Sequence, residues 1–261
     1  MMDKNNEGQS DSGMSFQGSF PRLYNELASW FHLLTAPEDY AEEAEFYRKT
    51  IISACRRPPQ TLLELGSGGG NNASHLKAHF TMTLVDLSSE MLNMSKSINP
   101  ECEHIQGDMR NTRLVRQFDA VFIHDAISHI ATEADLKSTI ETAFIHCKPG
   151  GAALFCPDYV RENYRSSTKH GGHDAGERGM RYLAWDRDPD PADNTYITDF
   201  AYILREGDNI RCEYDRMVMG LFGHQDWLRL IGEAGFEARS VPFKIRDMKT
   251  GSEVFLGFRP D

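Results

Sequence analysis

The sequence predicts a doubly wound α/β fold, in which helices cover both faces of a mostly parallel sheet. From residue 61 onward, short apolar segments bounded by Gly, Asp and Pro alternate with helical segments, a pattern typical of such sheets. The segment 37–52 before them starts with Pro and acidic residues, as helix N-termini favour. The predicted strands are 61–65, 81–85, 103–106, 118–123 and 152–156. The predicted helices are 37–52, 71–80, 88–98 and 133–147.

The alternation ends at Asp158. Residues 159–194 are polar, rich in Gly, Arg, His and Asp, and too long for a simple connection, so they predict a lid or substrate loop. Residues 195–205 and 209–219 alternate apolar and polar side chains about the turn E-G-D-N, which predicts a β-hairpin. The last predicted elements are a helix at 224–234 and strands at 236–241 and 252–258.

These patterns divide the chain into five segments. We expect a disordered tail at 1–19 and an N-terminal helical cap at 20–58. A ligand-binding core at 59–157 and its C-terminal part at 221–261 flank an insertion at 158–220, made of the loop and the hairpin on the substrate side. The tail has neither the basic start nor the apolar stretch of a secretory signal.

Composition limits the partners. The 261 residues contain 28 Lys and Arg against 39 Asp and Glu, a formal net charge of −11, which repels nucleic acid and anionic membranes. No apolar run approaches the ~20 residues of a membrane-spanning helix. The five cysteines contain no CxxC pair and indicate reduced thiols in a cytoplasmic protein. We therefore expect no nucleic acid and no membrane as partners.

The most informative motif is T-L-L-E-L-G-S-G-G-G at residues 61–70. Glycine allows backbone angles that are closed to other residues, and its missing Cβ lets main-chain N–H groups approach a ligand. By itself such a loop also suits a dinucleotide or a tight turn. Asp86 ends the next apolar run, where a carboxylate can accept hydrogen bonds from ribose hydroxyls. Asp108 and Met109 follow the third run at the same sheet edge and suit an adenine ring.

The ordered motifs E-L-G-S-G-G-G, V-D-L-S, G-D-M-R, F-D-A-V-F and K-P-G-G resemble those of the class I S-adenosylmethionine-dependent methyltransferases. The glycines fall as GxGxG after an acid, whereas a dinucleotide-binding fold favours GxGxxG. The resemblance implies a seven-stranded sheet and S-adenosylmethionine as the cofactor. It also implies that Glu64 and the loop hold the methionine portion, that residues at the second and third strand ends hold ribose and adenine, and that backbone after the fourth strand lies near the methionine amino group. The implied cofactor residues are Glu64, Gly66, Ser67, Gly68, Gly70, Asp86, Leu87, Asp108, Met109, His124 and Asp125.

Three residues are candidates for the chemistry: His129, His124 and Tyr24. Methyl transfer is an in-line displacement that depends mainly on alignment and on excluding water, and a base is optional. His129, in I-H-D-A-I-S-H-I, is the preferred candidate, and it resembles the histidine after the fourth strand in small-molecule N-methyltransferases, including those that act on amino sugars. It could instead hold a loop by hydrogen bonds. Tyr24, Trp30 and Phe31 predict either an aromatic wall over the methyl group or an amphipathic helix docked on the core.

Two further sets of residues, a possible metal site and a cluster of arginines, give weaker indications of function. His170, His173 and Asp174 lack a fourth metal ligand at a recognisable spacing, so we expect a solvated loop and no metal. Arg161, Arg165, Arg178 and Arg181 form either an anion clamp or a solvated face. No (N/D)PP(Y/F) motif follows the fourth strand and no Pro-Cys nucleophile is present, which disfavours methylation of nucleic acid.

The sequence thus predicts a methyltransferase that uses S-adenosylmethionine to modify a small molecule, most readily the nitrogen of an amine. Small-molecule O-methylation with His129 as general base is the nearest alternative. A nicotinamide-dependent oxidoreductase and a non-catalytic protein that binds S-adenosylmethionine are the others. A homodimer through the hairpin is left open.

Overall fold

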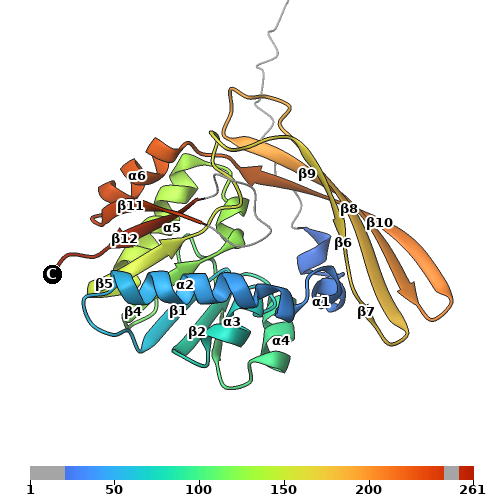
Figure 1. Ribbon diagram of the computed structural model, residues 1–261, viewed down its shortest axis with the longest axis horizontal. Coiled ribbons are helices and arrows are strands. Elements are labelled where there is room, and N and C mark those ends of the chain that lie inside the picture. The colour runs from blue at the N-terminus through green and yellow to red at the C-terminus, as the bar shows by residue number, and fades with distance from the viewer. Residues whose placement is uncertain (1–20, 244–252) are drawn as a thin grey trace, which may run out of the picture.

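The computed structural model describes residues 21–243 and 253–261, and it contains two sheets (Figure 1). The larger has seven strands in the order β11-β12-β5-β4-β1-β2-β3. Strands β5, β4, β1, β2 and β3 are parallel, and β12 and β11 add an antiparallel edge. The predicted α/β fold is therefore confirmed. The bounds are β1 Thr61–Leu65, β2 Thr81–Asp86, β3 Glu103–Gln106, β4 Phe118–Ile123, β5 Cys147–Phe155, β11 Glu237–Pro242 and β12 Glu253–Phe258.

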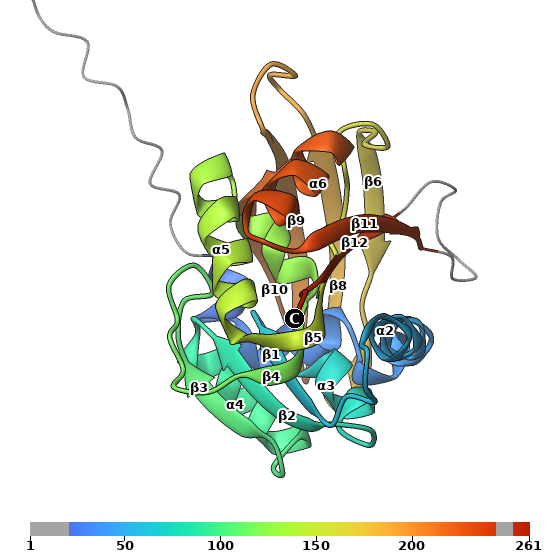
Figure 2. The same cartoon turned by 90° about the vertical axis from the view of Figure 1, so that its left-hand side faces the viewer.

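Helices cover both faces of this sheet, with α5 and α2 on opposite sides in Figure 2. Because successive side chains of a strand point to opposite faces, Leu63 joins the apolar cluster under α5 and α6, while Leu62 joins the cluster under α2 and α3. The helices are α2 Ala41–Ala54, α3 Asn71–Leu76, α4 Ser89–Ile98, α5 Glu133–His146 and α6 His224–Glu233. No helix in the described ranges is long and apolar enough to cross a membrane.

Most predicted boundaries are confirmed to within a few residues. The helix predicted at 37–52 begins as the 3-10 turn η3 Pro37–Tyr40 and continues as α2. Helix α4 starts after Ser88, whose hydroxyl accepts a hydrogen bond from the Met91 N–H (3.1 Å). The predicted helix at 71–80 ends earlier, at Leu76. The predicted tail at 1–19 and the first residue of the predicted strand 252–258 lie outside the described residues.

The expectation of a long lid loop at 159–194 is wrong. Much of this segment forms strands of a second, antiparallel sheet in the order β10-β9-β8-β6, with β7 paired to β8. Charged side chains within these strands interrupt the apolar–polar alternation by which a strand is predicted. They are accommodated because they pair across neighbouring strands, as Lys169 does with the buried Asp186 (3.1 Å). The predicted hairpin is confirmed as β9 and β10. The strands are β6 Ser167–Gly171, β7 Asp174–Ala175, β8 Arg178–Arg187, β9 Thr195–Glu206 and β10 Asn209–Gly220.

The N-terminal segment packs on this second sheet. Instead of one amphipathic helix it forms three short turns, η1 Arg22–Tyr24, η2 Ala28–Trp30 and α1 Phe31–Leu34. Leu23, Leu27 and Trp30 are buried against apolar side chains of β8, β9 and β10. The segment thereby lies between the second sheet and the glycine loop of the first.

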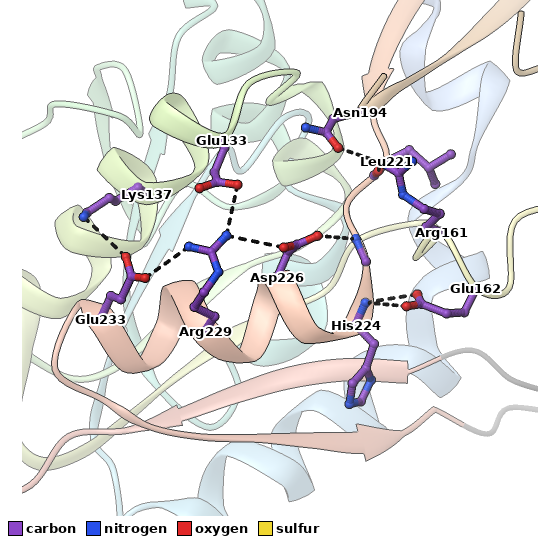
Figure 3. A network of polar contacts seen from close by, with 11 residues as sticks. Glu133, Lys137, Arg161, Glu162, Asn194, Leu221, His224, Asp226, Arg229 and Glu233 are labelled. Carbon is purple, nitrogen blue, oxygen red and sulfur yellow. Dashed lines mark hydrogen bonds and ion pairs between the residues drawn. The ribbon is translucent and has the colours of Figure 1, made fainter. Parts of the chain in front are cut away.

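Polar contacts attach the second sheet to the core at helix α6 (Figure 3). The Glu162 carboxylate accepts hydrogen bonds from the His224 N–H at the first turn of α6 (3.0 and 3.1 Å). Arg161 donates to the Leu221 carbonyl (3.1 Å) and to the Asn194 side chain (2.5 Å). Arg229 binds Glu133 on α5 (3.0 Å). These contacts hold the end of β10 beside the carboxyl ends of the parallel strands.

Candidate functional site

The loop between β1 and α3 forms a cradle that only glycine permits. Gly66, Gly68 and Gly70 have φ of 72°, 53° and 79°, in the left-handed region that other residues avoid. A Cβ on Gly66 would lie 2.3 Å from the Ala126 Cβ, so the close approach of the loop to η4 (Asp125–His129) also requires glycine. The predicted loop residues are thus brought together at the carboxyl end of β1.

Asp86 lies beside this loop, as predicted. Its carboxylate accepts hydrogen bonds from the N–H groups of Gly68 (2.7 Å) and Ser88 (2.9 Å). Burial raises the pKa of Asp86, and these hydrogen bonds offset part of the rise. Leu87 projects beside it and lines a surface pocket of about 290 Å³ together with Ser88, Gln106 and other residues of the β2 and β3 ends.

Several buried polar atoms around the loop have no hydrogen-bond partner among the described residues. They include the Glu64 Oε2, Asn71 Oδ1 and Asn72 Oδ1 acceptors and the Ser67 hydroxyl. Burial raises the pKa of Glu64 to about 8. Acceptors left unpaired in a buried cradle are costly unless a ligand donates to them. The ammonium group of a methionine portion is such a donor, so these residues fit S-adenosylmethionine.

Asp108 and Met109 occupy the third loop. Met109 is half-buried, and its sulfur lies 3.8 Å from the position that a Cβ on Gly66 would take. The Asp108 carboxylate binds the Arg110 side chain (2.7 Å). Burial raises the pKa of Asp108, but Arg110 outweighs it and the net shift is downward. Arg110 was not among the predicted site residues, because the sequence does not show that its side chain folds back two residues.

His124 and Asp125 follow β4 and form a charged cluster. The His124 Nε2 lies 2.9 Å from the Asp125 carboxylate and 3.4 Å from Glu43 on α2. Burial opposes a charge on His124, but Asp125 and Glu43 raise its pKa to about 10. The Asn72 amide donates to Glu43 (3.0 Å) and lies 3.2 Å from the His124 Nδ1. Sequence reasoning missed Glu43 and Asn72, whose place beside His124 follows only from the packing of α2 and α3.

His129 and Tyr24 meet across the gap between the two sheets. The Tyr24 hydroxyl and the His129 Nε2 share a hydrogen bond of 3.1 Å, and the rings are nearly perpendicular at 5.3 Å. Burial lowers the pKa of His129 to about 4, so the imidazole is neutral at pH 7. The structure thus brings two of the three catalytic candidates into contact, although 105 residues separate them.

The three aromatic residues of the N-terminal segment face different ways. Phe31 lies over the glycine loop, since a Cβ on Gly69 would come within 2.6 Å of its ring, and the neighbouring His32 Nε2 donates to the Gly69 carbonyl (3.1 Å). Trp30 faces the second sheet, under the Arg178 guanidinium (4.0 Å). Only Tyr24 and Phe31 therefore border the site.

The His, Asp and Arg side chains that could have formed a metal site or an anion site bind other parts of the protein instead. His173 pairs with Asp39 (2.9 Å), and Asp174 pairs with Arg181 and Arg205. No group of three or more His, Cys, Asp or Glu in residues 21–243 and 253–261 is arranged to hold a metal ion. Arg161 binds backbone carbonyls and Arg178 stacks on Trp30, so the arginines do not converge on one anion site.

The parallel sheet and the glycine cradle form a Rossmann-like fold, and comparison with known proteins identifies a methyltransferase domain in it. A family model described as "Methyltransferase domain" matches residues 62–151. Residues 62–151 therefore form a methyltransferase domain, and the protein is an S-adenosylmethionine-dependent methyltransferase, with S-adenosylmethionine as its cofactor.

Its relatives include two enzymes of Streptomyces. The dTDP-3-amino-3,6-dideoxy-alpha-D-glucopyranose N,N-dimethyltransferase of Streptomyces fradiae is 28% identical over 199 residues, 70% of this chain and 72% of that one. The dTDP-3-amino-3,4,6-trideoxy-alpha-D-glucopyranose N,N-dimethyltransferase of Streptomyces venezuelae is 30% identical over 131 residues, 49% and 54% of the two chains. Among solved structures, the sugar N-methyltransferase KedS8 from Streptoalloteichus is similar, with a TM-score of 0.79, 21% identity and coverage of 100% and 99%.

Proposed function

We propose that this methyltransferase N-methylates the amino group of a small molecule, namely an amino sugar carried on a nucleotide. The names of its relatives support this substrate class, and the Tyr24–His129 pair supports the choice of nitrogen. With a pKa of about 4, His129 is a weak base. It suits the orientation of an amine, which already has a lone pair once neutral, better than the deprotonation of a hydroxyl.

We assign the roles as follows. Gly66, Ser67, Gly68, Gly70 and Glu64 hold the methionine portion of the cofactor, Asp86 and Leu87 the ribose, and Asp108 and Met109 the adenine. His124 and Asp125 border the methionine portion. When bound, the cofactor supplies a methyl group on a positively charged sulfur. Tyr24 and His129 orient the amine, and Phe31 shields the glycine loop from water, which alignment of the reacting atoms requires.

The test compares two matched substrates with the purified enzyme and S-adenosylmethionine. We expect methylation of dTDP-3-amino-3,6-dideoxyglucose and none of dTDP-6-deoxyglucose, which has a hydroxyl in place of the amine. His129→Ala should lower the turnover of the amine about 10-fold to 100-fold by loss of alignment, while calorimetric binding of S-adenosylhomocysteine is unchanged. Methylation of the hydroxyl compound would establish O-methylation instead. Tight NADH binding, or cofactor binding without turnover of any amine, would favour the non-methyltransferase alternatives.

We also propose a homodimer through the outer face of the second sheet. Five of the nine large apolar side chains that are exposed within the described residues lie there, on three adjacent strands: Leu183, Trp185, Ile203, Ile210 and Tyr214. A patch of this kind on one sheet suits face-to-face packing on a second copy. Light scattering after gel filtration should give twice the chain mass, and Trp185→Asp with Ile203→Asp should give one chain mass. A monomeric wild type would refute the dimer.

We also propose that the protein binds neither nucleic acid nor a membrane and that it is located in the cytoplasm. A net charge of −11 supports the absence of a nucleic-acid partner. Cys147 and Cys156 are buried free thiols, which supports a cytoplasmic enzyme.

A further inference from the structure

A cavity of about 160 Å³ opens at the carboxyl ends of β4 and β5. Its carboxylates come from four separate elements: Glu43 on α2, Asp125 on η4, Asp158 after β5, and Glu253 on β12. Only Asp125 was among the site residues that the sequence indicated. The rings of Tyr47 and Phe243 line the cavity as well. A small, aromatic and strongly acidic cavity suits a cationic amine.

Asp158 is held in a defined position within this cavity. Its N–H donates to the Ser128 hydroxyl on η4 (3.0 Å), and the Tyr196 hydroxyl on β9 lies 3.4 Å from its carboxylate. The Asp125 carboxylate lines the same cavity, and its charge adds to desolvation in raising the pKa of Asp158. Two neighbouring carboxyl groups do not both ionise freely, so one of them holds its proton more tightly.

The two carboxyl groups of this pair have different environments. The Asp125 carboxylate lies 2.9 Å from the His124 Nε2, and 52% of the Asp125 side chain is exposed. Burial disfavours its charge, but His124 lowers the pKa of Asp125 overall. Desolvation of the carboxyl group and then repulsion from Asp125 raise the pKa of Asp158 to about 7, although the residue as a whole is exposed. The proton of the pair therefore resides on Asp158, and that group changes charge near neutral pH.

Helix η4 links the cavity to the Tyr24–His129 pair, although neither of these two residues lines the cavity. Helix η4 carries Asp125 at its first residue and His129 at its last. Burial and then the charges of Asp125 and Asp158 raise the pKa of Tyr24, so the acidic pair interacts electrostatically with this tyrosine. The element that carries His129 therefore also carries one member of the acidic pair.

We propose that Asp158 is the proton acceptor for the substrate amine and that Asp125 is its positioning residue. This inference rests on the proposed N-methylation. A free aliphatic amine is largely protonated at pH 7, since its pKa is about 10 in water, and the ammonium form has no lone pair for the methyl group. His129 is too weak a base for this proton, whereas a carboxylate that titrates near neutrality is suited to it.

The proton transfer balances without a further reactant. The N–H bond of the substrate ammonium breaks, its electron pair stays on nitrogen, and an O–H bond forms on the Asp158 carboxylate. Nothing is oxidised or reduced. A second methylation needs a second deprotonation, so Asp158 must return its proton to water at the exposed Asp125 side of the cavity before the next cycle.

The charges around Asp158 determine the direction of the pH dependence. Among the described residues, Asp125, Glu43 and Glu253 are the other acids that line the cavity, and His124 and Lys169 are the cations whose charges act on Asp158. The other ionisable side chains there include Tyr47, Tyr196 and Cys156, together with His224, whose Nδ1 lies 2.8 Å from the Glu253 carboxylate. Below a pH of about 7 Asp158 is protonated and cannot accept a further proton, so turnover falls as the pH decreases through this value.

The first experiment needs no substrate. Carboxyl ¹³C resonances of aspartate-labelled enzyme with S-adenosylhomocysteine are followed against pH, and the Asp158 signal is the one that Asp158→Asn removes. We expect a midpoint near 7 in the wild type and a midpoint moved toward the ordinary value of about 4 in Asp125→Asn. An ordinary midpoint in the wild type would overturn the proposal whatever the substrate is.

The second experiment measures kcat/KM for dTDP-3-amino-3,6-dideoxyglucose between pH 6 and 9. Asp158→Asn should lower kcat/KM roughly 100-fold and remove the decline near pH 7, with S-adenosylhomocysteine binding unchanged; Asp208→Asn, at the exposed β9–β10 turn, is the matched control. If the wild type is active and Asp158→Asn has the same kcat/KM and the same pH dependence, Asp158 is not the proton acceptor, while the proposed N-methylation stands. A wild type that methylates no amine overturns the proposed function, and the proton transfer with it.

Discussion

Two residues, Gly66 and Asp86, hold the cofactor loop in shape from opposite sides. Gly66 lets β1 turn away with a positive φ while the chain passes against Ala126. The two carboxylate oxygens of Asp86 accept hydrogen bonds from the Gly68 N–H and the Ser88 N–H. Gly66 acts through its backbone conformation and Asp86 through its side-chain carboxylate, and both contacts determine the shape of the same loop.

Asp86→Ala should weaken binding of S-adenosylhomocysteine by about 10-fold to 100-fold. Loss of the single hydrogen bond from the Gly68 N–H to the charged Asp86 carboxylate costs roughly 1.5–3 kcal/mol, and each 1.4 kcal/mol is about tenfold in affinity. Titration calorimetry measures it, with Asp208→Ala as the control and NADH as the parallel ligand. Equal affinities of wild type and Asp86→Ala would show that Asp86 does not support the cofactor site.

Gly66→Ala should lower the free energy of unfolding by more than Gly176→Ala does. Both glycines have positive φ, 72° and 59°, but only at Gly66 would the new Cβ meet another atom at 2.3 Å. The left-handed backbone costs about 1–2 kcal/mol in either variant, and the clash adds to it at Gly66 alone. Urea denaturation compares the two variants, and similar losses in both would mean that η4 moves away at little cost.

Among the elements, α6 depends on a residue from another part of the chain. Its N-terminal N–H groups lack partners inside the helix, and Glu162, from the segment after β5, accepts the hydrogen bond of the His224 N–H in Figure 3. Asp226 accepts the Gly223 N–H (3.2 Å). The cap therefore also fastens the beginning of the insertion to the core.

Glu162→Ala should destabilise the protein by about 1 kcal/mol, the usual cost of a lost helix cap. Hydrogen exchange of the first turn of α6 should accelerate, because that turn frays without its acceptor. Glu177→Ala, in the turn between β7 and β8, serves as the control. An unchanged exchange rate at His224 and its neighbours would show that Asp226 or solvent replaces the Glu162 cap.

At the scale of the whole molecule, Asp119 joins the two central strands of the sheet. Its carboxylate accepts hydrogen bonds from the Gln60 and Thr61 N–H groups (3.0 and 2.9 Å) and binds the Lys148 ammonium (2.7 Å). Burial raises the pKa of Asp119, but these partners outweigh it and lower the pKa to about 2. The contact ties the start of β1 to β4 and β5 at the edge opposite the site.

Stability should therefore decrease as the pH falls from about 4 to 2. A carboxyl group whose folded pKa lies below its unfolded pKa contributes stability above the unfolded value and loses it as the pH falls through the folded value. For Asp119 this amounts to roughly 2 kcal/mol at most. Urea denaturation at several pH values should show a shallower decline for Asp119→Asn than for wild type and Asp208→Asn. Parallel declines would show that other carboxylates carry the acid sensitivity.

The parallel core could be predicted because its signals are local. Apolar runs such as 61–65 and 118–123 are buried on both faces, so composition alone marks them, and β1 and β4 have these bounds. The strands of the second sheet are buried on one face only. Charged side chains on neighbouring strands form ion pairs with each other, such as Lys169–Asp186 and Arg187–Asp199. The sequence of residues 159–194 consequently predicts a loop, whereas much of this segment forms strands in the structure.

The fold class, the glycine loop and the place of Asp86 follow from the amino-acid sequence, because each depends on residues within one strand–turn–helix unit and on the rule that parallel strands end at one edge. The sequence also indicated Tyr24 and His129 separately. The folded chain was needed to show that these two touch, that Arg110 binds Asp108, and that Glu43, Asp125, Asp158 and Glu253 line one cavity. Charge and proton affinity depend on neighbours in space, and these neighbours come from elements far apart in the chain.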